Sequence, residues 1–577
     1  MYSTSLSPLF GFSSAKPFRL VMLGAAVLVL AVTTVTTSQA QTFSVLYNFG
    51  TNVSSDPYHP TFTGLVAQGR DGNLYSATPE GGTFRYYGAA FRITPLGTLT
   101  VLHSFASTEG YSPSGGLTLG TDGNFYGTDS GGGKFNSGTV FQITATGALT
   151  TLYPFLTINP DGVHPYAPPV QGRDGNYYGT TSYLSDGTDG GALYSVTPAG
   201  KYKLLFKFNG FGGSPGAFPN DPLIQATDGN FYGTTTLGGK VVSGLCVPSY
   251  ASPSCGTVFR MTPGGSVRFI YQFDKTNGAG PIGPLVQGSD GNFYGTTSYG
   301  GDANGDGVIF QLTPLGKIKI LHFFNGTDGK QPLGGLVQAT DGNLYGTASA
   351  GGAKGFGTLY KITTLGVFTP LHDFDKANGA TPEVTLFQHT NGILYGETHD
   401  GGLGVGTFYS WVDPANLKPF VSVLPGVGMI GTKMIGILGQ GFTATTTSVS
   451  FNGAPASFTF VSSTFLSATV PSAATTGIVT VVTPSGTLPS NKTFIVLPSI
   501  LSFSPTSGKV ASSVVITGGG LNGASLVTFG GIKATTFTVN SSMQVTATVP
   551  KGAKTGKIGI TTPAGMAISG GTFTVLP

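Results

Sequence analysis

A five-residue motif that returns about every fifty residues constrains this chain more than any other feature. Six copies read Asp-Gly-Asn, then Leu, Phe or Tyr, then Tyr, and a seventh is degraded to Asn-Gly-Ile-Leu-Tyr. The copies occupy residues 71–75, 122–126, 174–178, 228–232, 290–294, 341–345 and 391–395. A repeat of about fifty residues that combines turn residues with aromatic strands is typical of a β-propeller or a similar array. This period says much about architecture and little about chemistry.

Each repeat contains four short runs of β-forming residues separated by turns. In the sixth repeat, the first run is Gly335–Gln338, the second follows the Asp-Gly turn, the third is Gly357–Thr363 and the fourth contains Leu371-x-x-Phe374. Asp-Gly and Thr-Pro-x-Gly sequences supply the backbone angles that tight hairpins require. Each repeat is therefore expected to form four antiparallel strands.

The two ends of the repeat region decide the number of complete units. The Leu-x-x-Phe signature, or its Ile variant, occurs seven times, but its first copy, Leu46–Phe49, precedes every first run. The last repeat has a third run, Gly406–Val412, and no fourth. A ring that borrows its N-terminal strand hides its edges, whereas an open solenoid gains nothing from this permutation. The sequence predicts a seven-bladed β-propeller over residues 41–417, closed by the N-terminal strand.

The period breaks near residue 418, and two segments about eighty residues apart then match each other. Pro419–Pro425 parallels Ser499–Pro505, and Phe451-Asn452-Gly453 parallels Phe529-Gly530-Gly531. Short alternating strands in domains of this length are typical of immunoglobulin-like β-sandwiches. We therefore expect an all-β chain, with sandwich domains at 418–497 and 498–577.

Both regions resemble known families. The tail is similar to two IPT/TIG domains, through its Pro…Gly openings, Gly-x-Gly-[Phe/Leu] turns and closing strands at Phe494 and Phe573. The repeats resemble the GloVer tandem repeats of exported bacterial proteins, through Leu-Val-Gln-x-x-Asp-Gly-Asn-x-Tyr-Gly-Thr, then Gly-Gly and a Gly-Thr-[Val/Leu]-[Phe/Tyr] strand. Departures fall at Ser76 and at Asn391–Ile393. The resemblance implies an exported bacterial protein and carries no reaction with it.

Residues 1–40 have the pattern of a secretory signal peptide. Lys16 and Arg19 precede the apolar run Leu20–Val32, and Ser38-Gln39-Ala40 ends in small residues. The alternative is a retained membrane anchor, but the run is shorter than the roughly 20 residues that a spanning helix needs. No later segment could cross a membrane. We expect a secreted, extracellular or cell-surface protein.

Charge divides the chain into an acidic and a basic part. All 24 acidic residues lie between 41 and 413, against 18 basic residues in 41–417, which gives that region a charge of −6. Residues 418–577 contain eight lysines, no arginine and no acid. A basic tail attracts polyanions such as envelope polysaccharide, although scattered lysines also serve solubility alone. We expect no nucleic-acid partner, because the repeat region is acidic and the lysines of the tail are scattered.

Two sets of residues suggest structural bonds or a metal. Cys246 and Cys255 are the only cysteines, and in an exported protein they predict a disulfide. Asp302, Asn304 and Asp306 resemble the start of a calcium loop, but Thr313 stands at the twelfth position, where a calcium loop has an acid. None of the loop histidines has the spacing of a zinc motif. No other cofactor is expected.

The connections between the second and third runs, and between one repeat and the next, vary most and should share one face. Variable loops on a rigid scaffold are where binding residues concentrate, and aromatic side chains suit sugars or partner side chains. The candidate ligand-binding residues are Tyr58, His59, Tyr86, Tyr87, Tyr111, His164, Tyr166, Tyr183, Tyr250 and Tyr299.

The preferred hypothesis is an exported, non-enzymatic binding or cell-surface structural protein, whose sandwich domains act as spacer or attachment. Its ligand would be a polysaccharide, an envelope component or a protein. The alternative is a secreted polysaccharide lyase or glycosidase that uses loop carboxylates such as Glu109, Asp161, Asp221 and Asp400. Fold cannot separate the two, because propellers support both.

Overall fold

The computed structural model describes residues 41–577 except 53, 62–63, 158–161, 185–189, 209, 211–215, 251 and 446. The predicted signal peptide and Asp161 lie outside the described residues. The described chain is all-β apart from one 3-10 turn, η1 (Pro248–Tyr250). Among these residues no helix is long and apolar enough to span a membrane.

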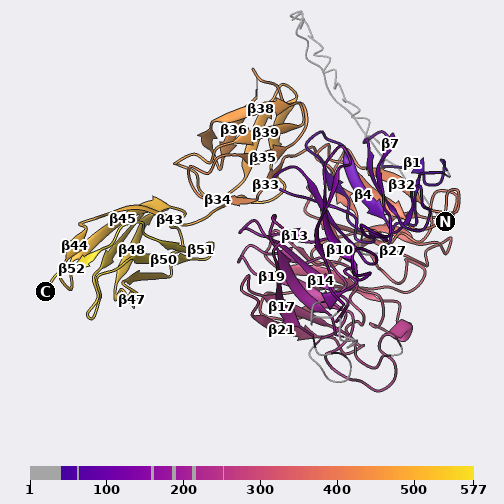
Figure 1. Ribbon diagram of the computed structural model, residues 1–577, viewed down its shortest axis with the longest axis horizontal. Coiled ribbons are helices and arrows are strands. Elements are labelled where there is room, and N and C mark those ends of the chain that lie inside the picture. Colours follow the sequence, from indigo (N-terminus) through magenta and orange to yellow (C-terminus); the bar gives the residue numbers. More distant parts are fainter. Residues whose placement is uncertain are drawn as a thin grey trace, which may run out of the picture. The chain divides into compact units, whose positions relative to one another are not determined.

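Seven four-stranded antiparallel sheets form the repeat region, residues 41–417 (Figure 1). The first three sheets are β3 (Ala67–Gln68), β4 (Leu74–Thr78), β6 (Ala89–Ile93) and β7 (Leu99–Ser104); β8 (Thr118–Leu119), β9 (Phe125–Asp129), β10 (Thr139–Ile143) and β11 (Leu149–Pro154); and β13 (Val170–Gln171), β14 (Tyr177–Thr181), β16 (Ala192–Val196) and β17 (Tyr202–Lys207). The next two are β18 (Ile224–Gln225), β19 (Phe231–Thr235), β20 (Thr257–Met261) and β21 (Val267–Gln272); and β22 (Val286–Gln287), β23 (Phe293–Thr297), β24 (Val308–Leu312) and β25 (Ile318–Phe323). The sixth is β26 (Val337–Gln338), β27 (Leu344–Ala348), β28 (Thr358–Ile362) and β29 (Phe368–Asp373).

The seventh sheet contains strands from both ends of the repeat region. It comprises β30 (Phe387–Gln388), β31 (Leu394–Thr398), β32 (Thr407–Val412) and the N-terminal strand β1 (Thr42–Asn48). β1 pairs antiparallel with β32, with Thr42 opposite Val412 and Asn48 opposite Thr407. The last repeat therefore obtains its fourth strand from the start of the chain.

The Asp-Gly-Asn corners stabilise the hairpins between the first and second strands. In the fifth sheet, Asp290 Oδ1 accepts a hydrogen bond from the Asn292 backbone N–H at 3.1 Å. Its Oδ2 accepts from Asn292 Nδ2 at 2.8 Å and from the Tyr294 hydroxyl at 2.7 Å. The same bonds recur in the other five Asp-Gly-Asn repeats. These aspartates act as turn residues, which explains their recurrence without a metal or a reaction.

A glutamine in the first strand joins most sheets to the one before. Its Oε1 accepts a backbone N–H from the preceding corner in six pairs: Thr121–Gln171, Arg173–Gln225, Thr227–Gln287, Ser289–Gln338, Thr340–Gln388 and Thr390–Gln68. The last pair joins the seventh sheet to the first. At the remaining junction Leu119 replaces the glutamine, and Arg70 Nη2 donates to the Thr121 carbonyl at 2.6 Å instead.

Apolar cores fill the spaces between neighbouring sheets. One cluster combines Tyr75 and Phe105 of the first repeat with Phe125 and Phe141 of the second. Another combines Leu74 and Phe91 of the first sheet with Tyr395 and Phe408 of the seventh. The first and seventh sheets therefore share a core in the same way as two consecutive sheets do.

Two β-sandwiches of equal topology follow the repeat region (Figure 1). The first contains β33 (Ser422–Leu424), β34 (Val427–Gly428), β35 (Ile435–Leu438), β36 (Ser448–Phe451), β37 (Ala454–Ala456), β38 (Phe458–Ser462), β39 (Phe465–Ala468), β40 (Val479–Thr483), β41 (Gly486–Pro489) and β42 (Ile495–Val496). The second contains β43 (Ser499–Ser504), β44 (Ser507–Gly508), β45 (Ser513–Gly519), β46 (Leu526–Phe529), β47 (Ile532–Lys533), β48 (Phe537–Ser541), β49 (Gln544–Thr548), β50 (Ile558–Thr562), β51 (Gly565–Ile568) and β52 (Thr574–Val575). Each has its own core, built around Phe451 in one and Phe529 in the other.

Candidate functional site

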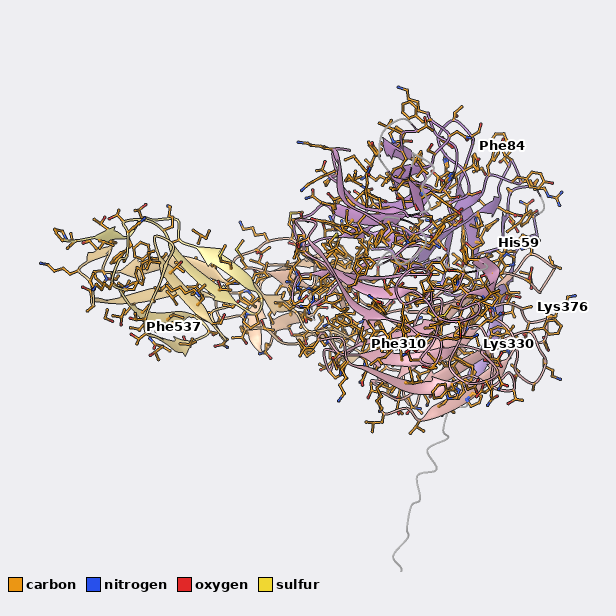
Figure 2. All side chains as sticks on the ribbon, turned by 90° about the horizontal axis from the view of Figure 1, so that it is seen from below. His59, Phe84, Phe310, Lys330, Lys376 and Phe537 are labelled. Atoms are coloured by element: carbon orange, nitrogen blue, oxygen red, sulfur yellow. A yellow bond between two sulfur atoms is a disulfide. The ribbon has the colours of Figure 1, made fainter. Side chains whose placement is uncertain are left out.

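The variable connections form a hydrogen-bonded layer at one end of the repeat sheets, which we call the loop layer. Antiparallel order places the connections between second and third strands at the same end as those between repeats. Within each repeat the two connections pair with each other, as β2 (Pro57–Tyr58) with β5 (Glu80–Gly81) and β12 (Gly162–Val163) with β15 (Tyr183–Leu184). Single bridges do the same in the other five repeats, at Tyr111–Gly131, Ala217–Leu237, Ala279–Tyr299, Lys330–Ala350 and Ala380–Asp400. In Figure 2, His59, Phe84, Lys330 and Lys376 of these connections lie along one edge of the repeat region.

A left-handed residue followed by proline occurs at the same place in every entering connection. The seven residues, with φ between 51° and 61°, are His59, Ser112, His164, Phe218, Gly280, Gln331 and Thr381. Each donates its backbone N–H to a carbonyl of the preceding sheet's loop, at 2.9–3.1 Å. Positive φ is uncommon outside glycine and is kept only where the surroundings impose it. The backbone is therefore fixed at these seven positions, and His59 and His164 occupy equivalent ones.

Four of the predicted tyrosines gather in the connections of the third, fourth and fifth repeats. The Tyr183 ring lies edge-on to His164, with centroids 5.8 Å apart, and edge-on to Phe218, at 5.0 Å. Phe218 in turn contacts Tyr250 at 5.6 Å. Burial raises the pKa of Tyr250, and Tyr183, Tyr166, Asp221 and Tyr299 are close enough to raise it further. We call His164, Tyr166, Tyr183, Phe218, Tyr250 and Tyr299 the aromatic cluster.

A disulfide holds one side of the aromatic cluster. Cys246 and Cys255 are joined, with their Cα atoms 5.1 Å apart, in the long connection of the fourth repeat. Both cysteines are buried in the core that contains Phe218. The bridged segment includes η1, and the Cys246 N–H donates to the Ser252 carbonyl at 2.7 Å. The bridge therefore limits how far Tyr250 can move from Phe218.

A buried polar pair lies next to the aromatic cluster. Asp221 is 2% exposed, and its Oδ2 accepts a hydrogen bond from the Thr234 hydroxyl at 2.7 Å. Its Oδ1 has no hydrogen-bond partner among the described residues, and burial raises the pKa of the carboxyl well above its usual range. The neighbouring Asn220 accepts a hydrogen bond from the Ser182 hydroxyl at 2.5 Å. Asp221 is therefore held in its protonated, neutral form more readily than a surface aspartate.

The remaining predicted residues lie elsewhere. Tyr87 and Tyr111 contact each other at 5.4 Å, and Tyr86 is 70% exposed. Tyr58 is 7% exposed and packs inside the loop layer, so its ring does not face solvent. In the predicted calcium loop, Asp302 Oδ1 accepts the backbone N–H groups of Asn304 and Gly305, so it caps its own turn, while Asp306 is half-buried.

Of the predicted loop acids, the three that the structure describes, Glu109, Asp221 and Asp400, lie in different repeats and do not form a carboxylate pair. Glu109 Oε1 lies 2.6 Å from His103 Nε2 in the second repeat's entering connection, and Asp221 is buried in that of the fourth. Asp400 lies in the seventh repeat, beside His399 and His59. This last group is one that sequence reasoning missed, because residues 59 and 399 are 340 positions apart. Phe218, at the centre of the aromatic cluster, was also missed.

Comparisons with known families match the repeat region and the second sandwich domain. The model of the Gloeobacter/Verrucomicrobia repeat matches residues 31–247 and 245–422, and the IPT/TIG domain model matches residues 498–575. No curated protein matches the chain.

Several solved structures share a distant likeness. A fungal alcohol oxidase of the AA5 family in complex with copper has 14% identity and a TM-score of 0.42, over 76% of this chain and 98% of its own. A putative gluconolactonase has 12% identity and a TM-score of 0.34, over 66% and 94%. A gluconolactonase from Xanthomonas campestris has 14% identity and a TM-score of 0.32, over 64% and 100%.

Proposed function

This chain belongs to the Gloeobacter/Verrucomicrobia repeat family, and we propose that it is an exported, non-enzymatic protein that binds a polysaccharide through the loop layer. Its repeat region would be a closed seven-bladed β-propeller. The two sandwich domains would serve as spacer or attachment at the cell surface. The signal-peptide pattern of residues 1–40 and the family resemblance support export.

Ring closure is supported by three contacts between the first and seventh sheets. β1 supplies the fourth strand of the seventh sheet. Gln68 accepts the Thr390 N–H through the same bond that joins consecutive sheets. Leu74 and Tyr395 belong to one apolar core. A ring protects every sheet edge, which an array of seven separate sheets would leave open.

The aromatic cluster is the observation that carries the proposed ligand class. Its rings are fixed by one another, by left-handed backbone positions and by the Cys246–Cys255 bridge. Tyr250 remains 37% exposed, and Tyr183 is half-buried. Rigid aromatic faces with polar tips stack on sugar rings and lose little conformational entropy when they bind. An acidic repeat region disfavours nucleic acid as the ligand.

Binding to immobilised glycans and polysaccharides tests this proposal. The mature chain should bind at least one polysaccharide, and Tyr183→Ala and Tyr250→Ala should each weaken binding by about tenfold or more, the effect of roughly 1.4 kcal/mol. Tyr86→Ala is the matched control, because Tyr86 is an exposed tyrosine of the loop layer outside the aromatic cluster. Equal losses in all three variants, or no binding to any glycan, would contradict the assignment.

Two buried carboxyls with raised pKa values favour the enzymatic alternative, which the same experiment can test. Burial raises the pKa of Glu383, in the loop layer of the seventh repeat, to about 8, with the charge of Asp400 adding to the effect. Asp221 is shifted in the same direction. Carboxyls kept neutral at pH 7 are what a lyase or glycosidase uses as general acids. Product release from the bound polysaccharide, abolished by Asp221→Asn or Glu383→Gln, would replace the non-enzymatic proposal.

A further inference from the structure

Two histidines and an aspartate meet in the loop layer where the first and seventh repeats adjoin. His59 follows β2 in the connection that enters the first repeat, and His399 and Asp400 follow β31 in the seventh. Figure 2 shows His59 at the edge of the repeat region. Within the described part of the chain, these three form the one group of His, Cys, Asp and Glu whose potential ligand atoms all lie within 4.8 Å of one another.

The backbone holds all three residues in place. His59 has a left-handed φ of 51°, and its N–H donates to the Val405 carbonyl of the seventh repeat at 3.1 Å. The His399 N–H donates to the Thr381 carbonyl at 3.0 Å. Asp400 and Ala380 exchange two backbone hydrogen bonds, at 2.8 and 3.0 Å. The side chains therefore approach one another from segments that are already fixed, before any ligand binds.

The distances match those between ligands of one small cation. Asp400 Oδ1 lies 3.2 Å from His399 Nδ1 and 3.6 Å from His59 Nδ1. Around a tetrahedral zinc ion, bonds of about 2.0–2.1 Å place ligand atoms roughly 3.3 Å apart. The two imidazole ring centroids are 4.7 Å apart, and one potential ligand atom of each of the three residues lies within 4.8 Å of the others.

The hydrogen bonding around the group leaves ligand atoms available. His399 Nδ1 is buried and has no hydrogen-bond partner among the described residues. The Thr381 hydroxyl donates to Asp400 Oδ2 at 3.4 Å, on the oxygen that does not face the histidines. His59 Nδ1 also lies 3.1 Å from the His399 carbonyl oxygen, so binding a cation through this nitrogen would replace that contact and leave the ring proton on Nε2.

We propose that His59, His399 and Asp400 bind a divalent transition-metal cation, Zn²⁺ in the first instance, and that this ion links the first and seventh repeats. Two imidazole nitrogens and one carboxylate oxygen suit zinc, whereas calcium takes oxygen ligands. Asp400 is 46% exposed as a side chain, so the ion can enter from solvent and retain a position for water or a ligand donor. The proposal does not depend on polysaccharide binding.

His164 provides a matched control within the same chain. It occupies the position of His59 in the third repeat, with φ 55° and a following proline. Its Nδ1 lies 2.7 Å from the Ser130 carbonyl, as His59 Nδ1 lies against that of His399. Ser130 and Gly131 stand where the seventh repeat has His399 and Asp400, so the third repeat offers the same histidine without the other two ligands.

The experiment is a zinc titration of the mature chain, produced without a histidine tag and stripped with chelator. Calorimetry should give one Zn²⁺ per chain, and Co²⁺ in its place should give the visible absorption of a tetrahedral site. Zinc at about 100 times its dissociation constant should raise the Tm by roughly 3–5 °C. His399→Ala and the isosteric Asp400→Asn should each weaken zinc binding by at least about 100-fold.

His164→Ala should leave both the affinity and the zinc-dependent rise in Tm unchanged. Circular dichroism of each variant without metal shows whether it is folded, and Asp400→Asn keeps the test valid if His399→Ala does not fold. No zinc binding by the folded wild-type chain would overturn the proposal. So would equal affinities in Asp400→Asn and His164→Ala.

Discussion

Replacing Gln68 tests whether the repeat region closes on itself. In a closed ring, Gln68 of the first sheet faces Thr390 of the seventh, and Gln68→Ala removes two bonds between sheets that are far apart in the sequence. Its Nε2 donates to Thr390 Oγ1 at 2.8 Å, and its Oε1 accepts the Thr390 N–H at 3.0 Å. Both residues are buried, at 3% and 1% exposure.

The magnitude follows from these contacts. A neutral intramolecular hydrogen bond contributes about 0.5–1.5 kcal/mol, and a buried N–H left without a partner costs about 1–3 kcal/mol. The alanine variant loses two bonds and leaves the Thr390 N–H buried, so the free energy of unfolding should fall by roughly 2–4 kcal/mol. Gln287→Ala is the control: Gln287 accepts the Thr227 N–H at 2.9 Å and donates to the Gly291 carbonyl at 3.1 Å, but it is only half-buried and Thr227 is exposed, so no buried N–H loses its partner. Its loss should be about 1–2 kcal/mol.

Urea unfolding followed by tryptophan fluorescence measures this difference directly. Trp411, the single tryptophan, lies on β32 of the seventh sheet and is 4% exposed. Its emission therefore reports unfolding of the sheet that contains both ends of the repeat region. If Gln68→Ala changed the unfolding free energy by less than about 0.5 kcal/mol while Gln287→Ala cost more than about 1 kcal/mol, the first and seventh sheets would not be joined and ring closure would be wrong.

Four other outcomes are expected. Burial raises the pKa of the Asp221 carboxyl, so its contribution to stability is complete below its unfolded pKa of about 3.9 and is lost as pH rises toward the folded pKa. The Tm of Asp221→Asn should therefore rise relative to that of the wild type between pH 4 and pH 7. A difference in Tm that does not change with pH would contradict this. Cys246→Ser with Cys255→Ser should lower local stability by about 2–3 kcal/mol at most, measured by hydrogen exchange in residues 238–255, and two free thiols in secreted wild-type protein would refute the bridge. Tyr294→Phe, which loses the hydrogen bond to the Asp290 carboxylate, should cost about 1–2 kcal/mol in urea unfolding. Tyr395→Phe should cost less, because its hydroxyl donates to the neutral Pro95 carbonyl at 3.3 Å and accepts from Asn391; equal costs would show that a charged acceptor adds nothing over a neutral one. If the eight lysines of residues 418–577 hold the protein to anionic envelope polysaccharide, retention of the full chain on cell envelopes should fall as salt rises to about 0.5 M, and retention indifferent to salt would exclude that attachment.

Local chemistry explains why so much of the fold could be predicted from the sequence. An Asp-Gly-Asn corner closes its hairpin with bonds between residues two and four apart, so the motif alone locates the turn. The pairing of β1 with β32 is not local, yet it was foreseeable because the last repeat lacks a fourth run and the chain begins with one. Counting the four runs of each repeat was therefore enough to predict this pairing.

Side-chain direction within the loop layer was harder to predict. Tyr58 and His59 are neighbours in one connection, and both were predicted to bind a ligand. The Tyr58 ring is buried, whereas the His59 side chain is 25% exposed, and the backbone between them turns to a left-handed conformation at His59. The types of the seven left-handed residues do not predict this backbone conformation, although the proline that follows each of them recurs in all seven repeats.

The group of His59, His399 and Asp400 shows what kind of signal was overlooked. Zinc motifs are read from ligands a few residues apart, and here the ligands are separated by 340 positions, so no such spacing exists. The structural repeat makes the separation irrelevant, because equivalent positions of adjoining repeats meet at every junction. His59 and His164 occupy the same position, and they differ only in what the preceding repeat contributes: His399 and Asp400 in one case, Ser130 and Gly131 in the other. Aligning the seven repeats and comparing each residue with the preceding repeat would have revealed the group, since a closed ring makes the seventh repeat the one before the first.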